Sequence, residues 1–538
     1  MKNTKQLKIS QSLSFPTLVS FLNSIEKQYS TRKNPMNFFK KFLILLSVLI
    51  LQECSGPPKP ESSEPKTDMN PQKSITIVLQ NLENPNPVVR RESVMDCMDL
   101  KDRSCLPKLR TLISKDPDPG VRGVSAVALG EFQDKASTQK ILELKKDREI
   151  FPETILDALT RMKDANAAFE ILEYLESQDA NLRLLAVEAL AVSNAKQASD
   201  KILVMATKNR DSEKDKTYVM ALGKLGYLPA ENYILEVGKK SEGPTRAASL
   251  LALGRIHSEK SVPFLLANLV SEVPKDQENA FWSLKELRSL SSFPKLKELL
   301  ENSKLEIRYM SAEVIALLPK EKVLPDIRKI FSQKSKLSIA PSGLILGKLK
   351  DEESRTKMET ELENKNTPER DVLAKALGWL GNSKSEPVLL KILETETGEL
   401  AHSAVWSLAF VGTKNSIPVL LKLTDSKDRK LQILAIESLG NLKEENSLPK
   451  LIALSSDDNL APFSLTAISQ IQTEESRLAL EKFASSSKPI QSKLAIEELG
   501  KRKNTKSLAF LKELYEKSDS EKKRLLALSI RNLESSQK

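Results

Sequence analysis

Asp118-Pro-Gly-Val-Arg-Gly-Val-Ser-Ala-Val-Ala-Leu-Gly130 is the stretch of sequence that decides the fold, because its pattern returns along most of the chain. When later segments are aligned on it, a Leu or Ile returns at the place of Leu129, and we call this residue the anchor of its unit. From Leu222 to Leu439 every step between anchors is 31 residues. The anchors are Leu129, Leu159, Leu190, Leu222, Leu253, Leu284, Ile315, Leu346, Leu377, Leu408, Leu439, Ile468, Leu499 and Ile530. Cys97 takes the same place in a first unit that begins near Asn84, so the pattern predicts about fifteen units, the last reduced to one helix.

Each unit is predicted to form two helices. In the first helix, the anchor, the residue before it and those three and four before it form one apolar arc at helical spacing. A glycine often follows the anchor, as at Gly130 and Gly254, and favours the end of a helix. A proline recurs ten residues past the anchor, as at Pro263 and Pro325, where the first turn of a second helix tolerates it. The second helix is then expected to bury the residue twelve past the anchor, such as Ile141.

This pattern resembles the HEAT-repeat family, in its short form of about 30 residues per repeat, and the resemblance covers residues 75–538. An arginine seven residues before the anchor, the Ala-Leu-Gly end of the first helix and the proline of the second helix carry it. The arginine recurs at Arg90, Arg122, Arg183, Arg246, Arg308 and Arg370. The resemblance implies that this arginine is structural and braces one repeat against the next. Other units carry Asp215, Ile339, Ala401 and Ala461 at this position, so the brace is not expected in every repeat.

A helix pair of this size cannot bury its apolar face alone, and stacking on neighbouring pairs is what closes the core. The predicted fold class is therefore all-α, an α-solenoid superhelix of about fifteen two-helix HEAT-like repeats. With only 16 Phe, 7 Tyr and 3 Trp, the composition also supplies few strand-forming residues. An extended body of this kind offers a long surface rather than a deep pocket, and this favours the binding of protein partners.

The N-terminus has the pattern of an export signal. Lys40 and Lys41 precede ten uncharged residues that end at Leu51, a segment too short to span a membrane but typical of a signal peptide. We predict a signal peptide over residues 1–53, with Met36 as a candidate true start, a disordered Pro/Ser-rich tether over 54–74 and the solenoid over 75–538. Cys54 resembles the lipidated cysteine of bacterial lipoproteins, which implies a lipid anchor in the cell envelope, at the periplasmic face or the outer membrane. Glu53 departs from the small residue of that pattern, so an uncleaved hydrophobic anchor remains the alternative.

The net charge of +11 is concentrated at the N-terminus. Residues 1–53 hold eight Lys and Arg against two acidic residues, which leaves a net charge of +5 on the remainder. A mixed, mildly basic surface of this kind does not favour nucleic-acid binding, which depends on a concentrated basic footprint.

Residues suited to catalysis are scarce. The two histidines, His257 and His402, belong to no metal-binding motif and are interpreted as surface residues without a role. No phosphate-binding loop or nucleophile motif occurs. We therefore expect no catalytic residue, metal or cofactor, and predict that the protein is not an enzyme.

Cys97 and Cys105 form either a disulfide or two buried thiols.

Two surfaces are candidates for partner binding. The position two before the anchor projects about 160° away from it around the helix, where polar residues are expected. Apolar residues occupy it at Met220, Leu251, Trp282, Leu344 and Trp406, and we assign them to an exposed outer ridge. The position eleven past the anchor, on the second helix, is assigned to the groove. It holds Lys108, Lys140, Lys201, Tyr233, Phe264, Lys295, Lys357 and Lys450.

The favoured function is a lipid-anchored envelope scaffold or adaptor that binds protein partners through the groove or the outer ridge, with no small-molecule substrate. One alternative is a nucleic-acid-binding HEAT-like protein, motivated by the lysines of the groove. The other is an enzyme similar to the HEAT-type bilin lyases, for which the short repeats are the sole point of resemblance.

Overall fold

A computed structural model of the chain describes residues 71–208, 211–333, 335–502 and 504–535. The chain divides into two units, Met1–Pro71 and Gln72–Lys538, and the second carries the repeats. Its described residues form α-helices and short 3₁₀ turns, and no strand. The predicted signal peptide, Met36, Cys54 and most of the predicted tether lie outside the described residues. The first described helix, α3, begins at Pro71, four residues before the solenoid start that we predict.

The first helices of the repeats are those that carry the anchors. They are α4 (Pro87–Leu100), α6 (Pro119–Glu131), α8 (Pro152–Met162), α10 (Ala180–Val192), α12 (Ser212–Lys224), α14 (Gly243–Arg255), α16 (Pro274–Leu287), α18 (Leu305–Ile315), α20 (Ile339–Lys348), α22 (Arg370–Leu380), α24 (Gly398–Val411), α26 (Arg429–Leu442), α28 (Ala461–Gln470), α30 (Pro489–Lys501) and α32 (Ser520–Ser535).

The second helices alternate with them, and most follow a 3₁₀ turn of three residues. They are α5 (Leu106–Lys115), α7 (Thr138–Glu143), α9 (Ala168–Ile171), α11 (Ser199–Lys208), α13 (Glu231–Lys240), α15 (Val262–Leu269), α17 (Phe293–Leu299), α19 (Lys320–Gln333), α21 (Arg355–Glu363), α23 (Glu386–Thr395), α25 (Ile417–Leu423), α27 (Leu448–Leu454), α29 (Glu474–Ala484) and α31 (Leu508–Glu516). Helix α3 (Pro71–Asn81) precedes the first complete pair. The last repeat is the single helix α32, as predicted.

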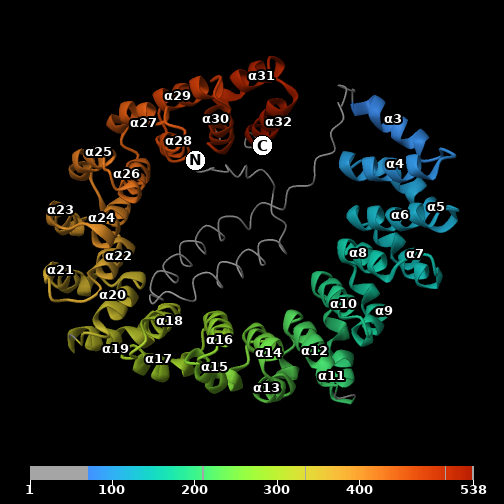
Figure 1. Cartoon of the computed structure of the whole chain (residues 1–538), viewed down its shortest axis with the longest axis horizontal. Coiled ribbons are helices and arrows are strands. Elements are labelled where there is room, and N and C mark those ends of the chain that lie inside the picture. The colour runs from blue at the N-terminus through green and yellow to red at the C-terminus, as the bar shows by residue number, and fades with distance from the viewer. Residues whose placement is uncertain (1–70, 209–210, 334, 503, 536–538) are drawn as a thin grey trace, which may run out of the picture. The chain divides into compact units, whose positions relative to one another are not determined.

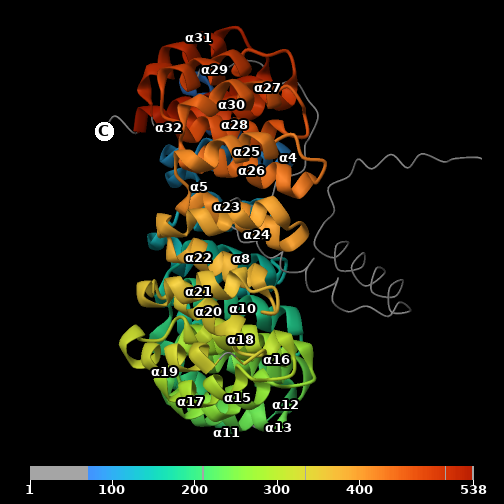
Figure 2. The same ribbon diagram turned by 90° about the vertical axis from the view of Figure 1, so that its left-hand side faces the viewer.

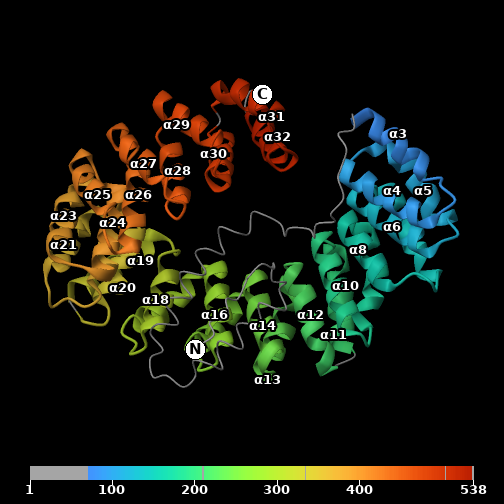
Figure 3. The ribbon, with the colours of Figure 1, turned by 45° about the horizontal axis from the view of Figure 1, so that its top comes forward.

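The helix pairs of the second unit follow one another around an arc in two layers (Figure 1). The first helices, such as α14 and α16, form the inner layer, and the second helices, such as α13 and α15, form the outer layer. Figure 3 shows the same two layers from a tilted direction, and Figure 2 shows the successive pairs from α21 to α28 stacked in order. First helices of neighbouring repeats pack directly on one another, whereas neighbouring second helices touch one another little. The predicted all-α solenoid is confirmed.

The core lies between the two layers and runs through all repeats. Every anchor from Leu129 to Leu499 is buried, Cys97 is buried with them, and Ile530 is partly buried at the C-terminal end. The residues twelve past the anchor are buried as well: Ile141, Ile171, Ile202, Ile234, Leu265, Leu296, Ile327, Leu389, Leu420 and Leu451. The spacing in the sequence therefore identifies both halves of the core correctly, because side chains at these intervals share one face of each helix.

Acidic or amide side chains cap five of the first helices, namely α4, α6, α10, α12 and α26. The Asp118 carboxylate accepts a hydrogen bond from the Val121 backbone N–H at 2.9 Å, and Pro119 occupies the first turn. Asn86 and Asp179 cap α4 and α10 in the same manner. These side chains satisfy backbone donors that have no partner within the helix. In these repeats the start of the first helix is thus marked in the sequence by an Asp or Asn.

The glycines after the anchors have a different role from the one that we predict. Gly130, Gly254 and Gly378 lie inside their helices and do not end them. A Cβ atom on Gly130 would stand 2.3 Å from the backbone oxygen of Ala158 in the next first helix, closer than any real contact. Gly223, Gly347, Gly440 and Gly500 face the next first helix equally closely. Glycine is needed here because the inner helices approach one another almost backbone to backbone.

In six of the seven repeats that carry the recurrent proline, this residue lies in the first turn of the second helix. Pro107 and Pro263 lie in the first turns of α5 and α15, as predicted. Pro325 is an exception, because it lies inside α19. This helix begins at Lys320 and takes in the segment that forms a separate 3₁₀ turn in neighbouring repeats, so its proline is not in the first turn.

The recurrent arginine braces the repeats, as the family resemblance implies. The Arg90 guanidinium donates to the backbone oxygens of Asn84 and Pro85, which precede its own helix, and to both carboxylate oxygens of Asp116, which precedes the next first helix, at 2.7 and 2.8 Å. Arg122 and Arg370 make the same two kinds of contact. One side chain therefore ties together the loops on either side of a helix pair.

Cys97 and Cys105 are joined by a disulfide between α4 and the turn before α5, which decides between the two alternatives left open by the sequence. Among the described helices, none combines the length and the apolar character that a membrane span requires.

Candidate partner-binding face

The inner layer presents a continuous row of side chains that point away from the second helices. We call this surface the inner face, and it consists of the residues two before and two after each anchor. Both positions lie about 160° from the anchor around the helix, which itself points to the core between the layers. All 3 Trp of the sequence, Trp282, Trp379 and Trp406, belong to this face.

The predicted outer ridge is located on the inner face. Met220, Leu251, Trp282, Leu344 and Trp406 lie on α12, α14, α16, α20 and α24, all helices of the inner layer. Their direction away from the second helices follows from the helical spacing, but the predicted outer location is wrong. Trp282 is 37% exposed, and Met220, Leu251 and Trp406 are half-buried. Four of the five residues can therefore contact a partner on the inner side of the arc.

Leu344 is the exception, because it is buried. Its helix, α20, is apolar around its whole circumference and is buried on every side from Ile339 to Gly347. Arg308 and Tyr309 of α18 reach past α20 and bind the Glu369 carboxylate at the start of α22, with Arg308 at 2.7 Å. Burial and this hydrogen bond raise the pKa of the Tyr309 hydroxyl. The two neighbouring repeats thus close over α20, and Leu344 is part of the core.

The residues predicted to line the groove are located on the outer layer instead. Lys108, Lys140, Lys201, Tyr233, Phe264, Lys295, Lys357 and Lys450 lie on α5, α7, α11, α13, α15, α17, α21 and α27. The prediction placed second helices on the concave side. The tight packing of the first helices gives the opposite curvature, so these residues belong to the convex side.

Several of these outer residues bind the preceding repeat rather than facing free solvent. Lys108 Nζ donates to the backbone oxygen of Leu79 at 2.9 Å, and Lys140 Nζ donates to that of Arg110 at 2.8 Å. Tyr233 differs, because its hydroxyl donates to Asp215 on the first helix of its own repeat at 2.7 Å and its ring is buried. Lys108 and Lys140 therefore link neighbouring second helices of the outer layer and do not line a basic groove.

Charged residues of the inner face are largely paired with the next repeat. Glu188, two before its anchor, binds Lys224, two after the following anchor. Glu313 binds Lys348 in the same relationship, and Lys285 lies 3.8 Å from it. Arg161 bridges Glu131 at 2.8 Å and Asp157 at 2.9 Å. In two of these pairs, Glu188 with Lys224 and Glu313 with Lys348, an acid two before one anchor meets a lysine two after the next.

Aromatic side chains gather in the C-terminal half of the inner face. The rings of Trp379 and Trp406 are 5.4 Å apart, and those of Trp406 and Phe410 are 4.6 Å apart. Phe410 is 54% exposed. Trp379 and Phe410 stand two residues after their anchors, a position that the sequence-based prediction does not consider. A search for apolar residues at this second inward position would identify both.

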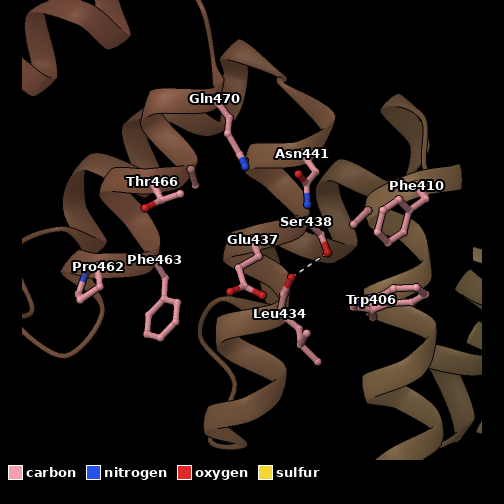
Figure 4. A pocket seen from close by; sticks show the side chains of 12 residues that line it. Trp406, Phe410, Leu434, Glu437, Ser438, Asn441, Pro462, Phe463, Thr466 and Gln470 are labelled. Atoms are coloured by element: carbon pink, nitrogen blue, oxygen red, sulfur yellow. Dashed lines mark hydrogen bonds between the residues drawn. The ribbon is translucent and has the colours of Figure 1, made fainter. Parts of the chain in front are cut away.

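A cleft opens beside these rings, between α24, α26 and α28 (Figure 4). Its volume is about 450 Å³. Trp406 and Phe410 line it from α24, Glu437 from α26 and Phe463 from α28. Figure 4 shows the Glu437 side chain between Phe463 on one side and Trp406 on the other. The cleft therefore combines aromatic walls with a single carboxylate.

The Glu437 carboxylate has no hydrogen-bond or ion-pair partner among the described residues. Its tip is open to solvent, but the walls of the cleft remove part of its hydration and raise its pKa above the usual range of a glutamate. Gln470, which also lines the cleft, has a buried Oε1 without a hydrogen-bond donor. The cleft thus holds acceptor atoms that no group of the chain satisfies.

The histidines do not both lie at the surface. His402 is buried in α24, and its Nε2 atom lies 2.6 Å from the carboxylate of Asp428, which caps α26. This hydrogen bond lowers the pKa of Asp428. The interpretation of His402 as a surface residue is wrong, because the close packing of α24 on α26 covers it. Within the described ranges, no three His, Cys, Asp or Glu side chains converge to hold a metal.

Comparison with known sequences supports the repeat assignment. The sequence pattern of HEAT repeats matches residues 75–152 and 386–463. The structure is similar to that of yeast importin-β (Kap95p), with a TM-score of 0.50 and 12% identity, covering 87% of this chain and 73% of that one. A likeness at this identity concerns the fold alone. It agrees with the predicted HEAT solenoid.

Two weaker matches concern enzymes. Epoxyqueuosine reductase of Bacillus subtilis (strain 168) is 39% identical over 64 residues, which is 11% of this chain and 17% of the reductase. The chain therefore matches only a small part of that enzyme's length. The complex of CpcE and CpcF of phycocyanin lyase from Nostoc sp. PCC7120 gives a TM-score of 0.28 at 16% identity, covering 49% of this chain and 94% of that one.

Proposed function

We propose that this protein is a membrane-tethered, non-catalytic scaffold that binds a protein partner along the inner face of its solenoid. The single observation that carries the proposal is the location of all 3 Trp on that face. Tryptophan is strongly enriched among the residues that dominate protein–protein binding energy. A solenoid needs no tryptophan on its concave side for its own stability, since its core lies between the two helical layers.

Exposure of apolar surface on the same face supports the proposal. Met95 is 46% exposed, Trp282 is 37% exposed and Phe410 is 54% exposed, and each lies on a first helix. Large apolar groups of this kind, spread between paired charges, are typical of a contact surface with a polar rim. An elongated partner can bury several of them at once because they recur along the arc.

A nucleic-acid-binding role finds less support. Its motivation was a row of lysines in the groove. These lysines lie on the outer layer, and Lys108, Lys140 and Lys450 bind the preceding repeat. On the inner face, lysines such as Lys224 and Lys348 are paired with acids. Binding to phosphates depends on unpaired basic groups that can displace counterions.

The tether is proposed from the sequence. The basic segment, the short apolar run and Cys54 together fit an exported lipoprotein of the bacterial cell envelope. The disulfide between Cys97 and Cys105 agrees with export, because structural disulfides persist in oxidising compartments. A lipid at the N-terminus would leave the whole solenoid free to reach a partner near the membrane.

Site-specific photo-crosslinking in cells tests the inner face. A photoreactive phenylalanine derivative replaces Trp282 on the inner layer or, as the matched control, Val204 on the outer layer, which is 59% exposed. We expect defined protein adducts from the Trp282 position and far fewer from the Val204 position. Equal adducts from both positions, or adducts from Val204 alone, would contradict the proposal.

Metabolic labelling tests the tether independently. Cells that produce the full chain or its Cys54→Ala variant are fed a clickable palmitate analogue, and the purified proteins are compared. We expect label on the parent chain and none on the variant, together with release of the variant from the membrane fraction. Equal labelling of both chains would exclude Cys54 as the lipid site and leave the inner-face proposal unaffected.

A further inference from the structure

Glu437 and Glu497, two acids of the inner face, lack the lysine that two equivalent acids meet in the next repeat. Glu188 and Glu313, each two residues before an anchor, bind the lysine that stands two residues after the next anchor. Glu437 occupies the same position before Leu439. The matching place in the next repeat, two residues after Ile468, is Gln470. The repeat that should supply a cation to Glu437 supplies a neutral amide instead.

The surroundings of Glu437 are suited to a cation that comes from outside the chain. Trp406 and Phe410 form one wall of the cleft and Phe463 contributes to the opposite side (Figure 4). Aromatic faces attract cations through their quadrupole, more strongly where water is excluded. Lys285 over Trp282 and Lys348 over Trp379, at 4.9 and 5.0 Å from the ring centres, show the same pairing elsewhere on the inner face. No lysine or arginine lines this cleft.

We propose that the cleft between α24, α26 and α28 is a receptor site for an arginine side chain of the protein partner, whose guanidinium binds the Glu437 carboxylate and stacks on the aromatic wall. The proposal deepens the proposed function, on which it rests, by naming what the partner must present. A guanidinium suits the site better than an ammonium, since it is planar, stacks on rings and binds a carboxylate through two parallel hydrogen bonds. The volume of about 450 Å³ accommodates one long side chain with part of its backbone.

A peptide titration tests the site directly. The full chain carries Trp282→Phe, so that Trp379 and Trp406 report the fluorescence near the cleft. The probe is acetyl-Gly-Ser-Arg-Ser-Gly-amide, and the control is the same peptide with citrulline, a neutral group of the same shape, in place of arginine. We expect a saturable fluorescence change with the arginine peptide. The citrulline peptide should bind with an affinity that is lower by a factor of about ten or more.

Three variants make the test specific. Glu437→Gln removes the carboxylate and is expected to weaken the arginine peptide about tenfold. Gln470→Lys places a lysine at the position that holds Lys224 and Lys348 in other repeats. We expect this lysine to form an ion pair with Glu437 and to weaken binding of the arginine peptide by a similar factor. Glu188→Gln removes an acid that already has a lysine, and should leave binding unchanged. Glu437 and Glu188 are exposed, whereas Gln470 is half-buried, so a circular dichroism melt checks that Gln470→Lys keeps the fold.

Several results would overturn the inference. Equal binding of the arginine and citrulline peptides, or binding unaffected by Glu437→Gln, would exclude recognition of a guanidinium. Tetramethylammonium binding as tightly as the arginine peptide would assign the cleft to quaternary ammonium groups, such as lipid headgroups, instead. Crosslinking through Trp282 without any peptide binding would refute this site alone, whereas crosslinking only from Val204 would refute the inner-face function.

Discussion

Gly254 in α14 lies directly against Ser283 in α16, so that a Cβ atom on Gly254 would stand 2.7 Å from the Cα atom of Ser283. The Ser283 hydroxyl also donates to the backbone oxygen of Leu250 at 2.8 Å. Ser407, Ser438 and Ser529 make the equivalent hydrogen bond to the preceding first helix. Close approach in one layer, without close approach in the other, is what curves a stack of helix pairs. The concave side is therefore the side of the first helices.

Replacement of Gly254 by alanine is expected to destabilise the protein by about 1–3 kcal/mol, because the added methyl group overlaps backbone and side-chain atoms of Ser283. Gly123→Ala in α6 is the matched control. Its nearest neighbour, a methyl carbon of Thr154, would lie at an ordinary 3.4 Å, and alanine should stabilise the helix by about 0.5–1 kcal/mol. Urea unfolding midpoints of the two variants should therefore shift in opposite directions. Equal shifts would show that the approach at Gly254 is not a tight contact.

The sequence predicts the helices and the core of this fold well, and its curvature poorly. Helical spacing places Leu129 and Ile141 on faces that must pack together, and both are buried. Spacing within one repeat does not say which layer is more tightly packed, since that depends on contacts between residues about 30 positions apart, such as Gly254 and Ser283. Because a glycine after the anchor also suits a helix end, the pattern of one repeat does not reveal that the first helices form the concave side.

The candidate site shows the same limit. Trp406 is identified from its position two before the anchor, but the cleft beside it depends on Glu437 and Phe463 from two further helices. The absence of a lysine at Gln470 has meaning only once Glu188 and Lys224 are known to pair across repeats. Leu344 is misjudged because burial of α20 comes from neighbours that close over it, and no feature of its own repeat reveals this.

Removal of one partner from the buried ion pair of Arg90 and Asp116 should be costly. Asp116→Ala leaves the guanidinium charge buried without its carboxylate, and we expect a loss of about 3–5 kcal/mol from the N-terminal repeats. Glu149→Ala is the control, because Glu149 is 67% exposed and Arg122 keeps Asp147 at 2.7 Å. Its cost should stay below about 1 kcal/mol. Hydrogen exchange of the α4 and α6 amides measures the loss of stability in each variant. Similar protection of these amides in the two variants would contradict the bracing role of Arg90.

The ion pair of Arg110 and Asp134 should make stability depend on acid pH. Arg110 donates to both Asp134 oxygens at 2.8 and 2.5 Å, and this hydrogen bonding lowers the pKa of the nearly buried carboxylate below its usual range. The pair therefore stabilises the fold fully above the unfolded-state pKa of about 4, and this contribution disappears as the pH falls through the lower folded-state pKa. Asp134→Asn should lower the urea midpoint at pH 7, and the difference from the parent should vanish at strongly acidic pH. If the urea midpoints of Asp134→Asn and the parent differed equally at pH 7 and in acid, the ion pair would not be the source of the pH dependence.

The arginine site should respond to pH in the range where Glu437 gains a proton. The walls of the cleft raise the pKa of Glu437, and no other residue that lines the cleft titrates. Because the guanidinium stays charged at every relevant pH, affinity for the arginine peptide should fall as the pH is lowered and the carboxylate becomes neutral. The decline should begin above the pH at which an ordinary glutamate, with a pKa of about 4.3, is protonated. The Glu437→Gln variant should bind weakly with no such decline. Peptide titrations of both chains between pH 7 and pH 4 measure the effect, and a flat profile for the parent chain would remove Glu437 from the site.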